Sequence, residues 1–514
     1  MIRKGILLLI ILINANHVFA QTGGNEDNIQ IKNELLPEIY RNNHPVFPDA
    51  LFDDTSYAQS NEKPMPGFVT MKRSLTLEKE ESLSVKVWPS VAMLAGSDLL
   101  NDDRKYDMGA GLNTVMRYKD DLIFRASYRY HRFNSYSFQE KLREKYKIIP
   151  GGPIALGQDY HDLHFRLSWK ASEYFTIDGG FDEHFIGNGY RSLMLSDAGY
   201  AYPYFKLNAN IWHFNYMALW INMKDFRLPG QSSWSDFKDK YAAIHYLSWQ
   251  VSPRIRLGFF DAIIWQGENE AGERGFEVNY LNPLIFLRPV EFAVGSPDNA
   301  MMGFDFDVRL GSNMIYFQLM LDEFKFEEIK AMNGWWGNKQ AFQLGWRSFD
   351  IAGQENLHAL AEFNYIRPYM YSHRTPMQSY GNYNQPLAHP AGANVMEALL
   401  HLTYSRNRWF ASVKNAFSFF GTSTGENNFG GDIFLDYNTR SKEYNNFVGQ
   451  GIENKLFNHV AELFYMLNEK NNLNIFTRVA FRNHEIENVV NGGLFIEAGI
   501  TNHPAAAANS WIDY

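Results

Sequence analysis

Residues 187–197 read GNGYRSLMLSD and combine glycines with side chains that can do chemistry. A Gly-x-Gly pair beside an arginine, a serine and an aspartate can cradle a phosphate, form a catalytic turn or shape a tightly folded loop. A dinucleotide-binding loop needs a third glycine between a strand and a helix, which this stretch lacks. We interpret Gly187 and Gly189 as positions of positive φ and expect Arg191 to pair with an interior carboxylate.

Two pairs of titratable residues are candidates for metal or catalytic sites. His161 and His164 carry metal-ligating rings, but residues three apart on a strand point to opposite faces. Asp322 and Glu323 diverge for the same reason, whereas a retaining glycosidase needs two carboxyl groups about 5 Å apart. No Ser/His/Asp set, nucleotide-binding motif or zinc motif is present. We predict that the protein is not an enzyme and binds no metal or cofactor.

Loop residues remain as candidates for ligand binding. Trp335 and Trp336 are adjacent, and such a pair can stack on sugar rings or anchor at a membrane interface. Asp322 is expected to face Arg309 or Arg347 in a ladder of charges. Glu291 and Asp298 lie in a long loop and are the expected partners of Arg191. The candidate ligand-binding residues are Tyr190, Arg191, Glu291, Asp298, Trp335 and Trp336.

The first twenty residues have the features of a secretory signal peptide. Arg3 and Lys4 give a basic start, residues 5–13 are apolar, and Val18-Phe19-Ala20 precedes Gln21. The apolar run is too short to span a bilayer, and we expect cleavage before Gln21. The chain has no cysteine, which excludes disulfides, cysteine-ligated metal and a lipid-modified cysteine.

Composition favours a membrane barrel over a soluble enzyme. Aromatic residues make up 16% of the 514 residues, and charged residues only 20%. Many aromatic rings are expected where a barrel meets the two membrane interfaces. Beyond the signal peptide, no apolar stretch approaches the length of a transmembrane helix. A net charge of −9 without a basic block argues against nucleic acid as a partner.

Alternation with period two indicates strands. In residues 121–133, Phe124, Ala126, Tyr128 and Tyr130 oppose Arg125, Ser127, Arg129 and His131. In residues 161–170, Leu163, Phe165, Leu167 and Trp169 oppose His164, Arg166, Ser168 and Lys170. One face is therefore apolar and the other carries rows of cations and polar groups.

The spacing of such segments predicts about eighteen strands whose connections alternate between short and long. Tight turns on one side and long loops on the other are typical of an outer-membrane β-barrel. A closed barrel pairs every backbone amide, as a lipid environment demands. The expected strands are 84–93, 107–118, 121–133, 160–170, 174–182, 204–212, 215–223, 241–251, 255–264, 303–310, 314–323, 341–349, 357–367, 395–404, 409–418, 458–467, 473–483 and 492–500.

We predict an all-β fold, a closed antiparallel transmembrane barrel in residues 84–514, after a signal peptide in 1–20. Residues 21–83 contain five prolines and no clear alternation, so we expect a short periplasmic or plug segment with one helix near 29–40. The long loops 183–203 and 265–302 are expected to fold inward. Inside the barrel, loop 183–203 either has a purely structural role or forms a surface that binds sugar or narrows the channel.

Three motifs carry a resemblance to a known family. FIGNGYRSLMLSD (185–197), RPVEFAVGSPDNAMMGFDF (288–306) and YFQLMLDEF (316–324) resemble motifs of the Wzi-like outer-membrane family of Bacteroidota, which includes capsule-assembly and RemB-type gliding-motility proteins. The resemblance implies an eighteen-stranded, non-enzymatic barrel in the outer membrane. It also implies a role with surface polysaccharide or adhesin-based motility.

Two features depart from that family. The Wzi proteins of enteric bacteria begin with a compact helical bundle, whereas residues 21–83 are too proline-rich for one. Outer-membrane barrels usually end on a strand with a terminal aromatic residue. Here NHPAAAANSWIDY breaks the alternation, although Tyr514 is aromatic.

The function predicted from the sequence is attachment or organisation of surface polysaccharide, or support of gliding and surface adhesion. The alternatives are a diffusion porin, whose inward loops merely narrow the pore, and an outer-membrane hydrolase. The expected partners are membrane lipid together with surface polysaccharide or the adhesin and motility machinery. We expect a monomer located in the cell outer membrane.

The alternation of loop lengths predicts which segments face the cell exterior. Epitope tags inserted at Asn427 or Asn384, in long loops, should bind antibody on intact cells. A tag at Asn471, in a short turn, should bind only after the outer membrane is permeabilised. Labelling of Asn471 on intact cells would contradict the predicted orientation.

Overall fold

The computed structural model describes residues 83–119, 121–146, 159–225, 237–269, 272–282, 298–425, 427–468 and 472–502. These residues belong to a single compact unit. The predicted signal peptide, the segment 21–83 up to its last residue, and the tail from residue 503 onward lie outside the described residues.

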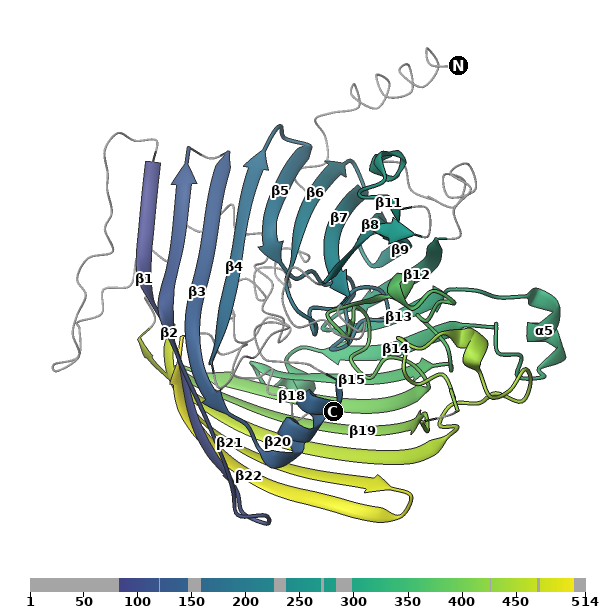
Figure 1. Cartoon of the computed structure of the whole chain (residues 1–514). Helices are drawn as coiled ribbons and strands as arrows, with labels where there is room; N and C mark the ends of the chain where they lie inside the picture. Colours follow the sequence, from purple (N-terminus) through teal and green to yellow (C-terminus); the bar gives the residue numbers. More distant parts are fainter. Residues whose placement is uncertain are drawn as a thin grey trace. The chain divides into compact units, whose positions relative to one another are not determined.

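Eighteen antiparallel strands form one closed barrel (Figure 1). Closure is made by the first and last strands, which pair from Ala92↔Thr501 to Asp98↔Phe495. Each of the eighteen predicted strands is confirmed. The strands are β1 (Leu83–Asp98), β2 (Asp103–Tyr118), β3 (Leu122–Asn134), β4 (Asp159–Lys170), β5 (Phe175–Asp182), β6 (Tyr202–Ile211), β7 (Phe214–Asp225), β8 (Lys238–Ser252), β9 (Ile255–Gln266), β12 (Asn299–Leu310), β13 (Asn313–Leu321), β14 (Gln340–Ser348), β15 (Leu357–Ile366), β18 (Val395–Arg406), β19 (Trp409–Thr422), β20 (Ile452–Asn468), β21 (Leu473–Ile486) and β22 (Val489–Thr501).

Several strands are longer than predicted, most clearly at the two hairpins next to the closure. Residues 94–106 and 484–491 were expected to be connections, yet β1 pairs with β2 as far as Asp98↔Asp103, and β21 pairs with β22 as far as Ile486↔Val489. Glu487 and Asn488 both have positive φ, as a two-residue type I′ hairpin requires. The sequence Glu-Asn lacks the glycine that usually marks such a turn.

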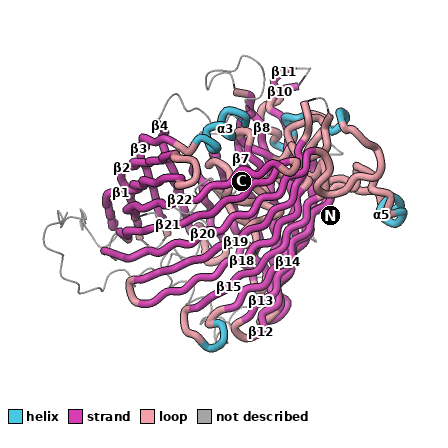
Figure 2. Tube along the Cα trace, turned by 90° about the horizontal axis from the view of Figure 1, so that it is seen from below, coloured by secondary structure: helices cyan, strands magenta, loops and turns pink. Residues whose placement is uncertain are grey.

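The connections divide between the two ends of the barrel. We call the end with short connections the turn end; its longest connection is 349–356, which contains η6 (Ile351–Gly353). The other is the loop end, beyond which most of the long loops gather (Figure 2). Its loops carry the remaining small elements: α3 (Ser137–Tyr146), β10 (Glu268–Asn269), β11 (Gly272–Glu273), η5 (Val278–Leu281), α5 (Phe326–Ala331), η7 (Pro376–Gln378), β16 (Gly381–Asn382), β17 (Gln385–Pro386) and η8 (Tyr437–Thr439). Within the described ranges, no helix has the length and apolar character needed to cross a membrane.

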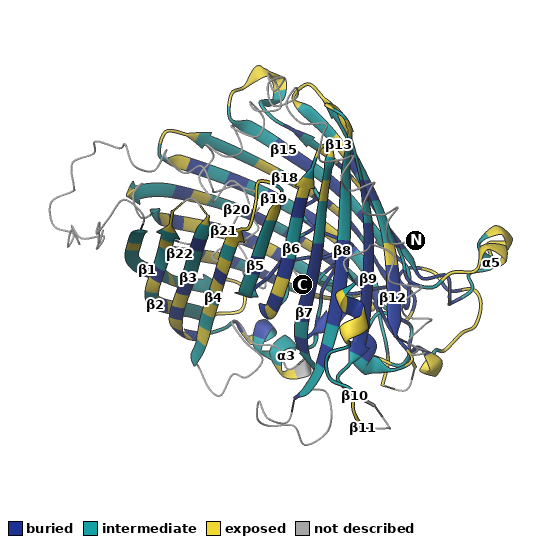
Figure 3. Cartoon of the chain, turned by 90° about the horizontal axis from the view of Figure 1, so that it is seen from above, coloured by how far each residue is buried: buried dark blue, intermediate teal, exposed yellow. Residues whose placement is uncertain are grey.

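Side chains alternate between an apolar outer face and a polar inner face, as predicted for β3 and β4. On β4, Phe165 and Leu167 are 36% and 45% exposed, whereas Arg166 between them is 4% exposed. Figure 3 shows this banding of buried and exposed positions along the strands. An outward belt of exposed apolar side chains is the pattern of a barrel surrounded by lipid.

Two loops from the loop end fold into the barrel, and we call loops 183–201 and 367–394 together the plug. Leu193, Met194 and Leu195 of the first loop share one buried apolar core with Tyr371 and Tyr380 of the second. Inward side chains of the wall complete this core, including Leu219, Ile244, Phe260, Ala262, Met301 and Met320. The predicted inward fold of the loop beginning at residue 183 is confirmed.

The other loop expected inside, 265–302, behaves differently in its described part. Tyr280 packs with Trp220 and Trp265, which lie on the outward face of β7 and β9. The indole N–H of Trp220 donates to the Tyr280 carbonyl at 2.7 Å. Residues 272–282 therefore cover the outside of the wall near its loop end, and the prediction of an inward loop is wrong for them.

The structure also qualifies the tag positions. Asn427 is exposed, but Asn384 is half-buried in the β16–β17 hairpin of the plug. Its neighbour Tyr383 donates its backbone N–H to the Lys224 carbonyl of β7 at 3.0 Å. The expected free access at Asn384 is not supported, while Asn471 lies outside the described residues.

A matched pair of substitutions on β4 tests the two faces. Phe165→Arg should reduce the yield of folded barrel, because a lipid-facing arginine near the midplane costs roughly 2–4 kcal/mol. Ser168→Arg places the same side chain on the inner face and should fold normally. Folded fractions can be measured by heat-modifiable gel migration after refolding into vesicles. Equal fractions for the two variants would refute the assignment of faces.

Candidate functional site

The GNGYRSLMLSD stretch is a hairpin-like loop inside the barrel. The backbone N–H of Ile186 donates to the Leu195 carbonyl at 2.9 Å. The Ser192 hydroxyl donates to the Ile186 carbonyl at 2.5 Å and accepts the backbone N–H of Met194 at 3.1 Å. The serine thus satisfies backbone groups that the apolar core would otherwise leave unpaired.

The two glycines have different structural reasons. Gly187 has a φ of 142°, so the predicted positive φ is confirmed there. The positive φ predicted for Gly189 is wrong, because Gly189 is not among the described glycines of positive φ. A glycine fits there because the loop backbone passes close to the wall. A Cβ on Gly189 would lie 2.3 Å from the Glu362 carboxylate. Any larger residue would push the loop away from the wall.

Arg191 fastens this loop to the wall through buried carboxylates. Its Nε and Nη2 donate to the Glu397 carboxylate of β18 at 3.3 and 3.4 Å. Its backbone N–H and that of Tyr190 donate to Glu362 of β15 at 3.1 and 2.7 Å. The predicted pairing of Arg191 with an interior carboxylate is confirmed.

Glu397 holds both halves of the plug. Besides Arg191, its carboxylate lies 3.0 Å from Nε2 of His389, which belongs to the second plug loop. Glu397, His389 and the Arg191 side chain are all almost fully buried. Removing one partner of such a group leaves the others charged or polar without compensation, which is more costly than losing an exposed pair.

Asp298, one of the two partners expected for Arg191, makes other contacts. Asp298 accepts both terminal guanidinium nitrogens of Arg274 at 2.7 and 2.8 Å, and the Tyr280 hydroxyl at 2.7 Å. It also accepts the Gln378 side chain of the plug at 3.0 Å. Asp298 therefore links the outer covering segment to the plug, and Glu291 lies outside the described residues.

Tyr190 points from the plug toward the inner wall. Its hydroxyl accepts the Lys414 ammonium at 2.8 Å, and its ring meets His401 edge-on at 5.8 Å. The side chain is half-buried. Its contact with a ligand stays a prediction.

The two tryptophans join neighbouring loops at the loop end. Both indole N–H groups donate to one oxygen of Glu443, at 3.1 Å for Trp335 and 3.0 Å for Trp336. The Trp336 ring is buried against Tyr437 at 4.8 Å and under the Arg440 guanidinium at 4.3 Å. Trp336 thus has a scaffold role, and sugar stacking stays a prediction for the half-buried Trp335.

Asp322 and Glu323 meet a lysine, not an arginine. Both carboxylates lie 3.2 Å from the ammonium of Lys339, which is fully buried. Burial raises the pKa of Asp322 to about 6, although the Lys339 charge opposes the shift. The expected partners have other contacts. Arg309 lies 3.7 Å from Asp307, and Arg347 donates to the Gly189 carbonyl at 3.3 Å.

A polar cavity of about 470 Å³ lies on the turn-end side of the plug. Residues 185–188 of the plug line it on the side toward the loop end, and Lys170 and Glu173 line it where β4 turns into β5. Its lining includes amide and guanidinium groups, which hydrogen-bond readily to hydroxyl-rich ligands: Arg125, Arg166, Arg256, Asn188, Asn208, Asn210 and Asn215.

Sequence reasoning did not identify this cavity, because its lining comes from seven consecutive strands. A usable signal was present on β7–β9, where both faces become apolar toward the loop end, as in residues 262–265. Apolar residues on both faces indicate a strand covered on both sides. Near the turn end the inner face becomes polar again, and there the cavity lies.

Comparisons with known proteins show the fold alone. No family model matches the chain, and no curated protein matches its sequence. The solved structure of Wzi from Escherichia coli is similar with a TM-score of 0.53 at 12% identity, over 80% of this chain and 83% of Wzi. It is described as a carbohydrate-binding outer-membrane barrel involved in group 1 capsule assembly.

Two weaker likenesses are to Pseudomonas aeruginosa barrels. OccK5 gives a TM-score of 0.44 at 10% identity, over 81% of this chain and 96% of its own. OprD gives 0.43 at 9% identity, over 82% and 94%.

Arg191→Ala tests the anchoring of the plug. Breaking a buried ion pair costs about 3–5 kcal/mol, so both plug loops should loosen while the barrel survives. We expect faster proteolysis within 183–201 and 367–394 and a higher single-channel conductance in planar bilayers. Arg132→Ala is the control, because its pair with Asp159 is exposed and such pairs contribute about 0–1 kcal/mol. Identical cleavage of the two variants would show that Arg191 does not hold the plug.

Proposed function

We propose that this protein is a non-enzymatic barrel of the outer membrane that binds surface polysaccharide and organises it at the cell surface. The observation that carries the proposal is the buried apolar core inside the barrel, where Leu193, Met194, Leu195, Tyr371 and Tyr380 are fully buried. A diffusion porin needs a continuous aqueous lumen. A lumen filled by folded apolar loops favours binding over permeation.

Three further observations support the outer membrane and a carbohydrate ligand. The belt of exposed apolar side chains suits lipid. The amide-rich cavity offers several donors and acceptors, as sugar hydroxyls require. The fold is similar to that of Wzi, which is described as a carbohydrate-binding barrel. The motif resemblance covers both capsule-assembly and RemB-type motility proteins. We propose the capsule-type role, and the strain phenotypes below distinguish it from a role in motility.

A deletion strain tests the proposal. Loss of the protein should move surface polysaccharide from the cell fraction to the medium, measured by uronic acid or hexose assay, while uptake of small sugars stays unchanged. Loss of sugar uptake with normal polysaccharide retention would favour a porin. Loss of surface spreading with normal retention would favour a motility role.

Complementation with point variants connects the phenotype to the cavity. Asn208→Leu removes a cavity amide, and a net hydrogen bond is worth about 0.5–1.5 kcal/mol, so retention should fall several-fold. Asn427→Leu makes the same change at an exposed loop position and should complement fully. Equal retention of polysaccharide by both variants would show that the cavity does not bind it.

A further inference from the structure

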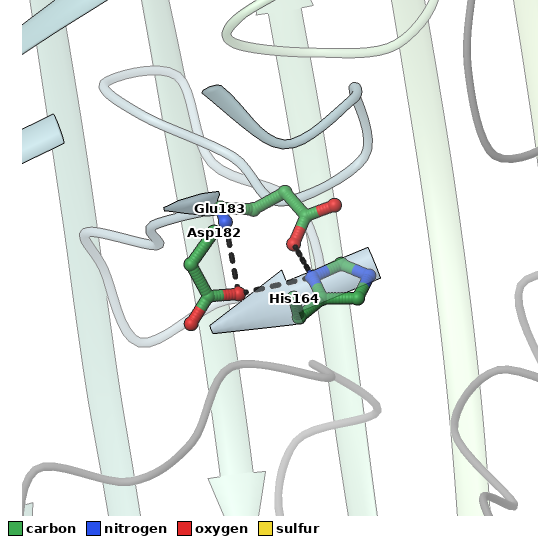
Figure 4. A group of neighbouring side chains, drawn as sticks. All are labelled: His164, Asp182 and Glu183. Atoms are coloured by element: carbon green, nitrogen blue, oxygen red, sulfur yellow. Dashed lines mark hydrogen bonds and ion pairs between the residues drawn. The ribbon is translucent and has the colours of Figure 1, made fainter. Parts of the chain in front are cut away.

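Three metal-ligating side chains converge where the wall meets the plug. His164 lies on the inner face of β4, Asp182 ends β5, and Glu183 begins the first plug loop (Figure 4). Nδ1 of His164 lies 3.2 Å from Asp182 Oδ1 and 3.2 Å from Glu183 Oε2. The three ligand atoms all lie within 4.8 Å of one another.

These distances suit a tetrahedral centre. Zinc bonds to nitrogen and carboxylate oxygen are about 2.0–2.2 Å long, which puts neighbouring ligands of a tetrahedron about 3.4 Å apart. The two separations of 3.2 Å are already close to that value. Three protein ligands leave a fourth position for water.

The groups behind the three ligands provide an independent argument. Nε2 of His164 lies 2.7 Å from Asp162, so its N–H can donate there while Nδ1 presents its lone pair to a cation. Metal-bound histidines almost always donate their second N–H to a carboxylate or carbonyl in this way. Asp162 is in turn bound by Arg129, and the second oxygen of Asp182 lies 3.5 Å from Arg166.

The two carboxylate ligands are held in place and shielded from solvent. Asp182 pairs with Arg166 through its second oxygen, and Glu183 contacts the His164 ring. The Asp182 and Glu183 side chains are only 2% and 11% exposed.

We propose that His164, Asp182 and Glu183 bind one divalent transition-metal cation of the Zn²⁺ class. An imidazole nitrogen with two carboxylate oxygens selects this class over Mg²⁺ and Ca²⁺, which prefer all-oxygen sites. The metal joins the wall strand β4 to the base of the plug. The proposal is independent of the polysaccharide function and departs from the absence of metal expected from the sequence.

The sequence hides this site because its ligands come from two paired strands and from the residue that follows the second of them. The expected divergence of the two histidines is confirmed: His161 is exposed on the outer face, where Nδ1 lies 2.9 Å from the Tyr128 hydroxyl. The partners of His164 follow from the register Phe165↔Phe181, which places Asp182 opposite it. Only the pairing of β4 with β5 shows this.

Zinc binding by the purified full chain in detergent tests the proposal. After removal of metal with chelator, dialysis against Zn²⁺ should load one equivalent, measured by mass spectrometry of the metal. Co²⁺ should give visible absorption of tetrahedral intensity. His164→Gln should weaken Zn²⁺ binding at least tenfold. Asp162→Asn should weaken it by roughly 10–100-fold, the usual effect of losing the group that orients a ligand.

His161→Gln is the matched control, since it removes a histidine from the opposite face of the same strand. It should bind Zn²⁺ like the wild type. Glu183→Gln replaces a loop residue and serves if His164→Gln fails to show heat-modifiable migration. No bound equivalent in the wild type, or equal loss in His161→Gln and His164→Gln, would overturn the proposal.

Discussion

The pairing of β1 with β22 is the constraint on which the rest of the structure depends. It converts a sheet with two open edges into a closed wall in which backbone donors and acceptors are paired strand to strand. Once the wall is closed, every strand must present alternate residues to two different environments. Phe165 and Arg166 are neighbours in sequence, yet one lies on the exposed apolar face and the other is 4% exposed inside.

The interior itself divides into two regions. Toward the loop end, inward residues such as Phe260 and Met320 form an apolar core with the plug. Toward the turn end, the inner wall presents arginine and asparagine around a cavity. The two plug loops are held to the wall by buried polar contacts, above all the Glu397 carboxylate, which meets both Arg191 and His389. Because these side chains are buried, leaving one of their charges unpaired would be costly. The contacts therefore favour one arrangement of the plug.

This division bears on function more directly than the barrel fold does. Eighteen-stranded barrels serve permeation as well as binding, and likeness at 12% identity with Wzi shows architecture alone. The filled lumen moves the expected activity to the two ends of the barrel. At one end lies the polar cavity. At the other, Glu443 joins Trp335 and Trp336 into a compact group of loops.

The sequence by itself determined the eighteen strands and their two faces, because period-two alternation and turn spacing are local properties of the chain. Only the tertiary structure decided which residues from distant parts of the chain contact one another. Glu397 lies 206 positions from Arg191, Lys339 replaces the arginines expected beside Asp322, and residues 272–282 cover the outer face. His164 meets Asp182 and Glu183 through strand register. Such contacts depend on closure and register, which no local pattern encodes.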